Sequence, residues 1–126
     1  MAQVNLERAS YLVDDGNDGK VIIRALADIP GGRALDCSAW GEDVVRSGHI
    51  IKHNTVTGEY APLGVSAGAY VGLAENEEYA GVLEGSVLKN KAFAAILTMG
   101  EVNAAASPYP VTPAIKAGLP TIKFLY

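Results

Sequence analysis

Glycine and other turn-forming residues recur along this chain between short apolar runs, and this spacing constrains the fold more than any other feature. The chain holds 14 glycines among 126 residues. Apolar runs of about four to eight residues bounded by Gly, Asn or Asp are typical of strands, whereas helices usually need ten or more residues. We therefore expect a mainly β domain, with little room for long helices.

The strands predicted from these runs can be placed along the chain. They cover residues 11–13, 20–26, 49–53, 70–74, 81–89, 92–99 and 121–125, and residues 34–38 are compatible with a further short strand. One short helix is predicted near the C-terminus, because Thr112 is a good N-cap, Pro113 a good first residue and Gly118 a good stop, while Pro120 forbids continuation. Residues 63–69 are predicted to be a loop of small residues.

The length of the chain fits one domain with a single core. We expect residues 11–126 to form this domain as a small β-barrel or a β-tulip-like fold. The first ten residues show no core pattern, so residues 1–10 are predicted to be an N-terminal arm, either frayed or ordered only on a partner.

Charge and composition exclude several classes of protein. Ten basic and 14 acidic residues give a net charge of −4, and the basic residues are scattered singly, which argues against a nucleic-acid partner. The single cysteine, Cys37, cannot form an internal disulfide and is expected to be a half-buried apolar residue; no metal or cofactor is predicted. Because no signal-peptide core and no run of roughly 20 apolar residues is present, we expect a soluble protein, without a membrane partner, made in a cytoplasm.

Residues 14–19, with the sequence DDGNDG, are rich in Asp, Asn and Gly. This composition suits the positive φ angles of a tight hairpin between the first two predicted strands. The alternative is a calcium loop, but the EF-hand pattern fails from either Asp14 or Asp15 because glycine or alanine stands where oxygen ligands are needed.

The sharpest signal of an enzyme is Gly64–Gly68, which matches the G-x-S-x-G motif of serine hydrolases around Ser66. Those enzymes place the catalytic His after the serine, whereas His49 and His53 both precede it. On a strand these two histidines would share one polar face about 13 Å apart, too far to hold one zinc ion. We therefore predict that the chain is not an enzyme and that Ser66 lies in a loop.

Other polar and aromatic residues are weighed as contact sites. Glu75, Glu77 and Glu78 are predicted to form a solvated acidic loop, without a partner cation. Trp40, the only tryptophan, is interpreted either as an aromatic anchor for a partner or as a cover over the edge of the core.

The segment Gly100–Asn103 is predicted to be a strand bend, with Val102 inward and Asn103 capping the next turn. With no partner for acid–base chemistry, Glu101 is interpreted as a subunit contact rather than a catalytic base. The expected subunit or partner contacts are Trp40, Glu101 and Asn103.

The order of features from Gly48 onward resembles a known family. The segments are GHIIKHNTVTGEYAP (48–62), a small-residue loop, YVGLA (70–74), AGVLEGSVL (80–88), an apolar strand ending in GEVN (100–103), a proline-containing crossover with a short helix, and a terminal strand. This order resembles the head decoration proteins of lambda-type phages, in which a G-x-V-N step often precedes the last helix and strand. Residues 9–36 are more similar to phage head-fibre or capsid accessory proteins.

The resemblance implies a β-rich homotrimer on the outside of a DNA-filled capsid, bound to the major capsid protein and located in the virion after synthesis in the host bacterium. It also implies an N-terminal arm that adds to a sheet edge of the capsid protein. The arm maps to residues 2–10 here, so the resemblance implies Val4, Asn5, Leu6 and Arg8 as capsid-binding residues.

Two alternatives from other functional classes stay open. One is a glycan- or receptor-binding β-module of a virion or cell-surface appendage, in which Trp40 and Tyr60, Tyr70 or Tyr79 would stack on sugar. The other is a small serine hydrolase that uses Ser66.

Overall fold

A computed structural model describes residues 20–126 of the chain, and it is mainly β with short helical segments. In chain order the strands are β1 (Ile22–Asp28), β2 (Arg33–Ala34), β3 (Val44–Val45), β4 (Ile50–Asn54), β5 (Tyr60–Pro62), β6 (Val65–Ser66), β7 (Ala69–Tyr70), β8 (Glu77–Leu83), β9 (Val87–Leu88), β10 (Phe93–Ala94), β11 (Ile96–Asn103) and β12 (Ile122–Leu125). The helices are η1 (Lys89–Lys91), η2 (Ala104–Ala106) and α2 (Pro113–Gly118). The predicted fold class is therefore confirmed.

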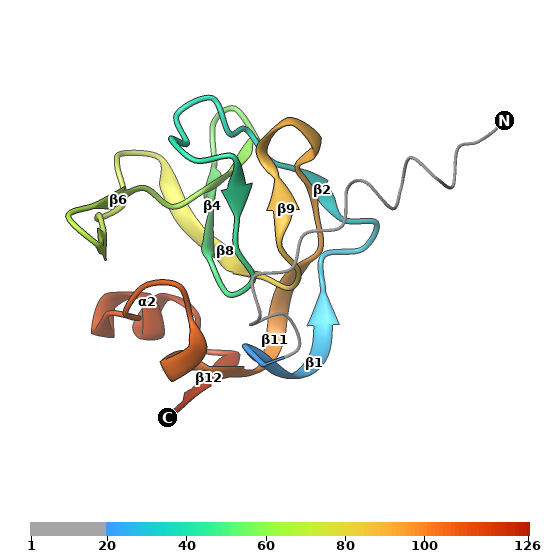
Figure 1. The fold of residues 1–126 in the computed structure, drawn as a ribbon, viewed down its shortest axis with the longest axis vertical. Helices are drawn as coiled ribbons and strands as arrows, with labels where there is room; N and C mark the ends of the chain where they lie inside the picture. The colour runs from blue at the N-terminus through green and yellow to red at the C-terminus, as the bar shows by residue number, and fades with distance from the viewer. Residues whose placement is uncertain (1–19) are drawn as a thin grey trace, which may run out of the picture.

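The main sheet has the strand order β1-β11-β8-β4-β5, and β12 also pairs with β11. Three two-stranded sheets, β10–β2, β3–β9 and β6–β7, extend this sheet at its margins (Figure 1). The sheets do not close into a barrel, so the barrel part of the prediction is wrong. The described strands β1 and β5 lie at opposite ends of this open sheet.

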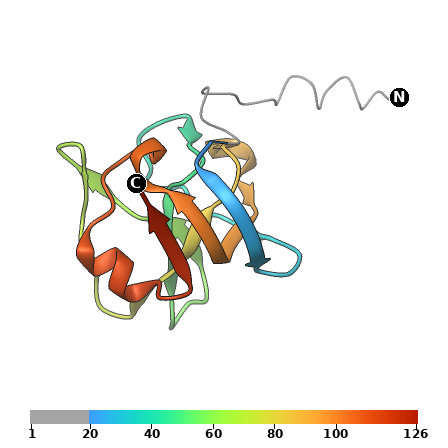
Figure 2. The same cartoon turned by 90° about the horizontal axis from the view of Figure 1, so that it is seen from below.

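Strand β11 pairs with β1, β8 and β12 and so connects the strands in the lower part of the molecule as drawn in Figure 1. One edge pairs antiparallel with β1, while the other pairs first with β8 at Ile96 and Leu97 and then in parallel with β12 from Gly100 onward. Strands β1, β11 and β12 lie side by side in Figure 2. The register between β1 and β11 shifts at three places, as expected where bulges bend a long strand.

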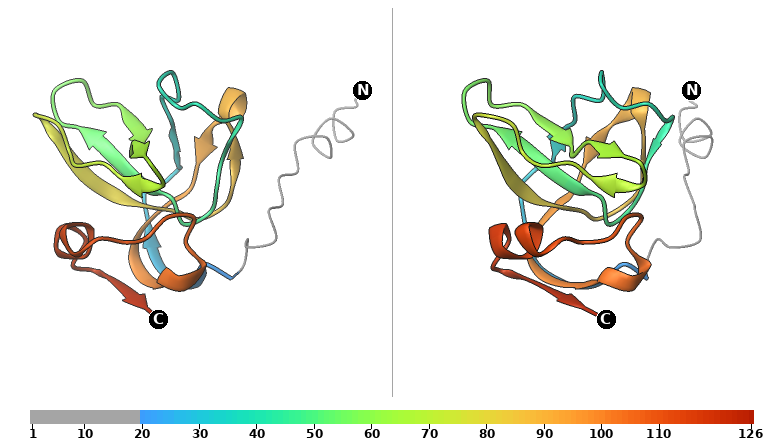
Figure 3. Two further views of the ribbon diagram at one scale, coloured as in Figure 1. Left: turned by 60° about the vertical axis from the view of Figure 1, so that its left-hand side comes forward. Right: turned by 90° about the vertical axis from the view of Figure 1, so that its left-hand side faces the viewer.

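The central strands β4, β8 and β11 of the main sheet carry buried side chains on both faces, which explains their continuous apolar runs. Neighbouring residues of a strand point to opposite faces. Ile50, Val82 and Leu97 accordingly join one buried cluster, whereas Ile51, Leu83 and Ile96 join a second. The first cluster also takes in Ile115, Leu119 and Ile122 from the C-terminal segment, which covers one side of the sheet (Figure 3).

The predicted short helix is confirmed as α2. The Thr112 hydroxyl accepts a hydrogen bond from the Ile115 amide at 3.3 Å, and Pro113 occupies the first turn. Burial of Ile115 in the core then holds this short helix against the sheet. Strand β12 follows it and confirms the predicted terminal strand.

Several predicted strands differ from those observed. Residues 20–26, 49–53 and 121–125 are close to β1, β4 and β12, whereas the strand predicted at 70–74 is wrong, because β7 ends at Tyr70 and β8 starts at Glu77. The strand predicted at 81–89 is divided into the end of β8 and the short β9, and residues 92–99 are divided between β10 and β11. The observed β8 begins within the acidic segment because Glu77 and Glu78 gain basic partners on β4, as described below.

Some predictions concern residues 1–19 and lie outside the described part of the chain. They are the arm with Val4, Asn5, Leu6 and Arg8, the strand at 11–13 and the turn at 14–19. From residue 20 to residue 126, no helix is long and apolar enough to cross a membrane.

Candidate functional site

The motif Gly64–Gly68 forms a hairpin rather than the strand-to-helix turn of a hydrolase. Ser66 pairs with Ala69 across β6 and β7, and the two residues between them, Ala67 and Gly68, have φ angles of 54° and 77°. Positive φ at both central residues is typical of the tight two-residue turn of a β-hairpin. Ser66 is therefore an exposed residue at the end of a short strand, not in a loop as predicted.

His49 is buried, so its predicted place on a polar strand face is wrong. It precedes β4, and its Nε2 lies 2.8 Å from the Leu63 carbonyl oxygen, while its Nδ1 is buried without a hydrogen-bond partner among the described residues. The rings of Trp40, Tyr70 and Tyr109 lie edge-on to the imidazole, with centroids 4.7, 5.1 and 5.8 Å away. Burial lowers the pKa of His49 to about 4, which makes it a neutral part of the core.

The acidic segment is only partly the solvated loop that was predicted, because Glu75 lies exposed in a turn whereas Glu77 and Glu78 belong to a strand. Glu77 and Glu78 lie on β8 opposite β4, where Lys52 Nζ is 2.9 Å from the Glu77 carboxylate and His53 Nδ1 is 2.9 Å from that of Glu78. The pairing joins residues about 25 positions apart in the chain, as antiparallel strands allow. These partners, Lys52 and His53, are not predicted by the sequence pattern because they lie far from the glutamates along the chain.

Trp40 covers the edge of the core, which is one of the two roles predicted for it. Its indole N–H donates to the Val44 carbonyl at 2.9 Å, and its ring packs against His49. Lys89 Nζ donates to the Trp40 carbonyl and fixes the backbone as well. The ring is only half-buried, and its remaining surface lines a pocket, so it is held rigidly where a ligand could reach it.

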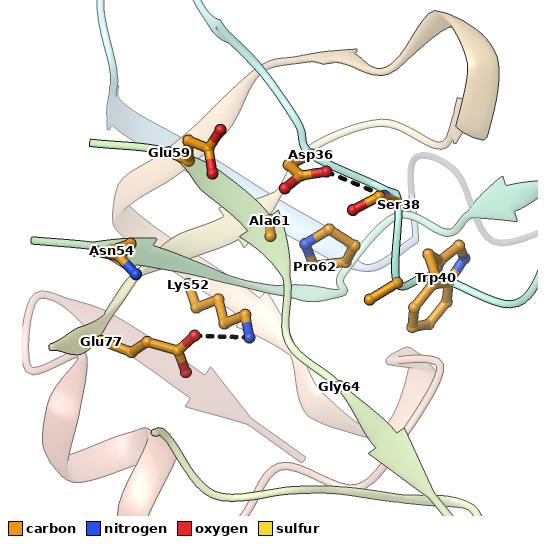
Figure 4. Close-up of a pocket in the computed structure, with 11 residues that line it drawn as sticks. Asp36, Ser38, Trp40, Lys52, Asn54, Glu59, Ala61, Pro62, Gly64 and Glu77 are labelled. Atoms are coloured by element: carbon orange, nitrogen blue, oxygen red, sulfur yellow. Dashed lines mark hydrogen bonds and ion pairs between the residues drawn. The ribbon is translucent and has the colours of Figure 1, made fainter. Parts of the chain in front are cut away.

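This pocket, which we call the Trp40 pocket, has a volume of about 250 Å³ (Figure 4). Its residues come from four parts of the chain: the segment after β2, strand β4, the region of β5, and the start of β8. Ala61, Pro62 and Gly64 provide small apolar surfaces. The residues that carry charge, an amide or an aromatic ring are Asp36, Trp40, Lys52, Asn54, Glu59 and Glu77.

The polar groups of the Trp40 pocket are mostly hydrogen-bond acceptors. A hydrogen bond from Ser38 lowers the pKa of Asp36, and a hydrogen bond from Lys52 lowers that of Glu77, so both carboxyls are ionised at neutral pH. Three carboxylates and one ammonium group leave a formal surplus of two negative charges. The residues of this site are spread over 42 positions of the chain, from Asp36 to Glu77, so no local sequence pattern predicts it.

A second candidate surface lies along β1. Only one edge of this strand is paired within the described chain, and residues 23–28 are all exposed. The exposed fraction is 45% for Ile23 and 61% for Leu26, and Met99 on the neighbouring β11 is 43% exposed. An exposed strand edge with apolar side chains is a template for pairing with another chain. We call the exposed residues 23–28 of β1, together with Met99 of β11, the β1 face.

Glu101 and Asn103 have local roles in the structure. Glu101 lies opposite Arg24, whose Nε is 3.8 Å from the Glu101 carboxylate, so a cation does lie near this residue. Asn103 Oδ1 accepts a hydrogen bond from the Ala105 amide at 3.0 Å, which confirms that it caps the turn. Val102 is fully buried, as predicted. Glu101 is only partly exposed on a strand that adjoins the β1 face.

Two carboxyl groups also meet where β1 and β8 end. Burial and a hydrogen bond with Asp28 raise the pKa of Glu84, whose Oε2 has no hydrogen-bond partner in the described chain. Burial and the neighbouring Asp28 carboxyl both disfavour the charged form of Glu84, so the folded state favours a protonated Glu84. The pair makes the fold sensitive to rising pH.

We expect Glu84→Gln to stabilise the protein at neutral pH. Because the folded state raises the pKa of Glu84, it binds more protons than the unfolded state, and stability falls as pH rises from the ordinary range through the raised pKa. Glutamine keeps the shape of the side chain without its charge. The increase in the free energy of unfolding should therefore appear at pH 7 to 8 and vanish near pH 4, and it should stay below about 1 kcal/mol. Urea denaturation at both pH values, with Glu75→Gln as an exposed control, measures this effect. An equal increase in the free energy of unfolding at both pH values would contradict the raised pKa of Glu84.

No group of three or more potential metal ligands occurs between residues 20 and 126. Cys37 is buried rather than half-buried as predicted, and burial raises the pKa of its thiol. Comparison with models of known protein families, with curated proteins and with solved structures finds no match to this chain. The functional proposals below therefore rest on the chemistry of the β1 face and the Trp40 pocket.

Proposed function

We propose that this chain is a virion structural protein that decorates the outside of a phage head and stabilises it by binding the major capsid protein. The observation that carries the proposal is the β1 face, an exposed strand edge with Ile23 and Leu26. Strand addition to such an edge supplies backbone hydrogen bonds, and the side chains give specificity. The order of sequence features from Gly48 to the C-terminus supports the same class.

The proposal includes self-association into a trimer on the capsid. An open sheet with exposed apolar residues at one end can bury that surface either against a second copy or against the capsid protein. Light scattering of the purified chain measures its mass and so tests directly whether copies of the chain associate. A strict monomer that also fails to sediment with capsids of its own phage would overturn the proposed function.

A charged substitution on the β1 face should weaken capsid binding strongly. We expect Leu26→Asp to reduce the affinity for capsid shells by at least about 30-fold, because burying an unpaired carboxylate in an apolar contact costs about 2 kcal/mol or more. The measurement is co-sedimentation of the chain with shells assembled from the major capsid protein of the same phage.

Val56→Asp is the matched control for this experiment. Val56 is 72% exposed but lies in the turn between β4 and β5, at the far end of the sheet from β1. Its substitution should leave sedimentation unchanged, while circular dichroism verifies that both variants are folded. Equal binding by Leu26→Asp and the natural chain would show that the β1 face is not the capsid contact.

The aromatic residues give the glycan-binding alternative limited support. Tyr70 is buried, Tyr79 lies over Gly118, and Tyr60 is stacked on His53 with ring centroids 4.5 Å apart. Only Trp40 of the predicted group lines the Trp40 pocket. A broad aromatic platform for sugar stacking is therefore not present within residues 20–126.

A further inference from the structure

We propose that the Trp40 pocket binds a guanidinium group, presented as an arginine side chain of a protein partner. The inference goes beyond the proposed function and does not depend on the β1 face. It rests on three properties of the pocket: its volume, its balance of hydrogen-bond donors and acceptors, and its fixed aromatic wall.

The volume suits one side chain. Pockets for drug-sized ligands usually span roughly 300–1,000 Å³. The Trp40 pocket, at about 250 Å³, lies below this range, and Figure 4 shows the residues that line it. A single planar head group on a flexible stem therefore fits better than an extended ligand.

Carboxylates outnumber the cationic groups of the pocket, and several of its donors are already used. Lys52 is paired with Glu77, and the indole N–H of Trp40 donates to Val44, while the amide N–H groups of Asn54 remain as donors. Asp36 uses Oδ1 to accept from the Ser38 amide, and its other oxygen lies toward the Glu59 carboxylate in Figure 4. The surplus of carboxylates therefore favours a cationic ligand, and guanidinium supplies five N–H donors and no acceptor.

The aromatic wall favours the same group. The Trp40 ring is held by its hydrogen bond to Val44 and by its contact with His49, so it needs little ordering on binding. A guanidinium is planar and weakly hydrated, and it stacks on an indole face while its edge meets carboxylates. A neutral saccharide would gain from the ring but not from the surplus negative charge.

Trp40 is the only tryptophan in the chain, so its fluorescence reports on the pocket directly. The probe is N-acetyl-L-argininamide, titrated into the full-length chain at low salt and followed by Trp40 fluorescence and by calorimetry. N-acetyl-L-citrullinamide, which replaces the guanidinium by a neutral urea, is the matched control ligand, and methyl α-D-glucopyranoside tests for sugar binding. We expect saturable binding of the arginine derivative alone.

Variants locate the binding within the pocket. Glu59→Gln is expected to weaken binding at least about tenfold, because it replaces a charge-assisted hydrogen bond by a neutral one. Glu75→Gln, which changes an exposed carboxylate outside the pocket, should bind as the natural chain does. The proposal is overturned if calorimetry detects no binding, if citrulline or glucoside binds equally well, or if Glu59→Gln leaves the affinity unchanged.

Discussion

Gly100→Ala is expected to destabilise the fold by about 3 kcal/mol or more, because a Cβ atom at this position would collide with the backbone carbonyl oxygen of Arg24. Gly100 lies opposite Ala25 of β1 on one side and Ile122 of β12 on the other. Since both neighbours are paired strands, the collision cannot be relieved by rotating a side chain. Relief requires separation of β1 from β11.

Urea denaturation of the purified variant measures this loss. Gly85→Ala is the matched control, because no atom lies within 4 Å of a Cβ built at Gly85, and its effect should stay within about 0.5 kcal/mol. If Gly100→Ala were as stable as Gly85→Ala, β1 could not pack against β11 in the described register. The β1 face would then be absent from the native surface.

The segment Gly100–Asn103 shows how far local sequence can predict structure. The buried Val102 and the capping Asn103 follow from alternation and turn chemistry, and both predictions are confirmed. The close approach of Arg24 is not visible in the sequence, because it depends on pairing with a strand more than 70 positions earlier. Local patterns therefore identify the bend but not the reason that glycine occupies it.

The same limit applies to the candidate site. Trp40 is visible in the sequence as the single tryptophan, but Lys52 and Glu77 become members of the pocket only when β4 pairs with β8. Likewise, the apolar pairs at residues 50–51, 82–83 and 96–97 predict strands without predicting that both faces of these central strands are buried. Long-range strand order decides these features, and short motifs do not encode it.

His49 illustrates the opposite case, in which a residue type misleads. A histidine next to a polar segment suggests a solvated strand face, yet this imidazole is fully buried beside three aromatic rings. Nε2 lies at hydrogen-bond distance from the Leu63 carbonyl, which can only accept, so Nε2 carries the proton. Nδ1 then has no proton and no partner among the described residues, and a second proton there would place an uncompensated charge in the core.

We therefore expect a loss of stability below pH 6.5 that originates at His49. Its pKa is about 4 in the folded protein against an ordinary value of 6.5, so the unfolded state binds more protons between these values and stability falls as pH falls. The difference corresponds to a loss on the order of 3 kcal/mol, complete below about pH 4. Urea denaturation from pH 7.5 to pH 3.5 measures the loss, and the NMR titration of the His49 ring should have its midpoint near pH 4.

His49→Gln separates this effect from the titration of carboxyl groups. The variant should be less stable at pH 7, because it leaves the aromatic contacts with Trp40 and Tyr70 incomplete, but its stability should decline less on acidification. His53→Gln, which changes the half-exposed partner of Glu78, is the control and should retain the steep decline. Parallel pH profiles for His49→Gln and the natural chain, or a His49 midpoint near 6.5, would contradict the buried neutral imidazole. A confirmed result would also show that Trp40 rests on a rigid, uncharged support at neutral pH, which is the preorganisation that guanidinium stacking in the adjacent pocket requires.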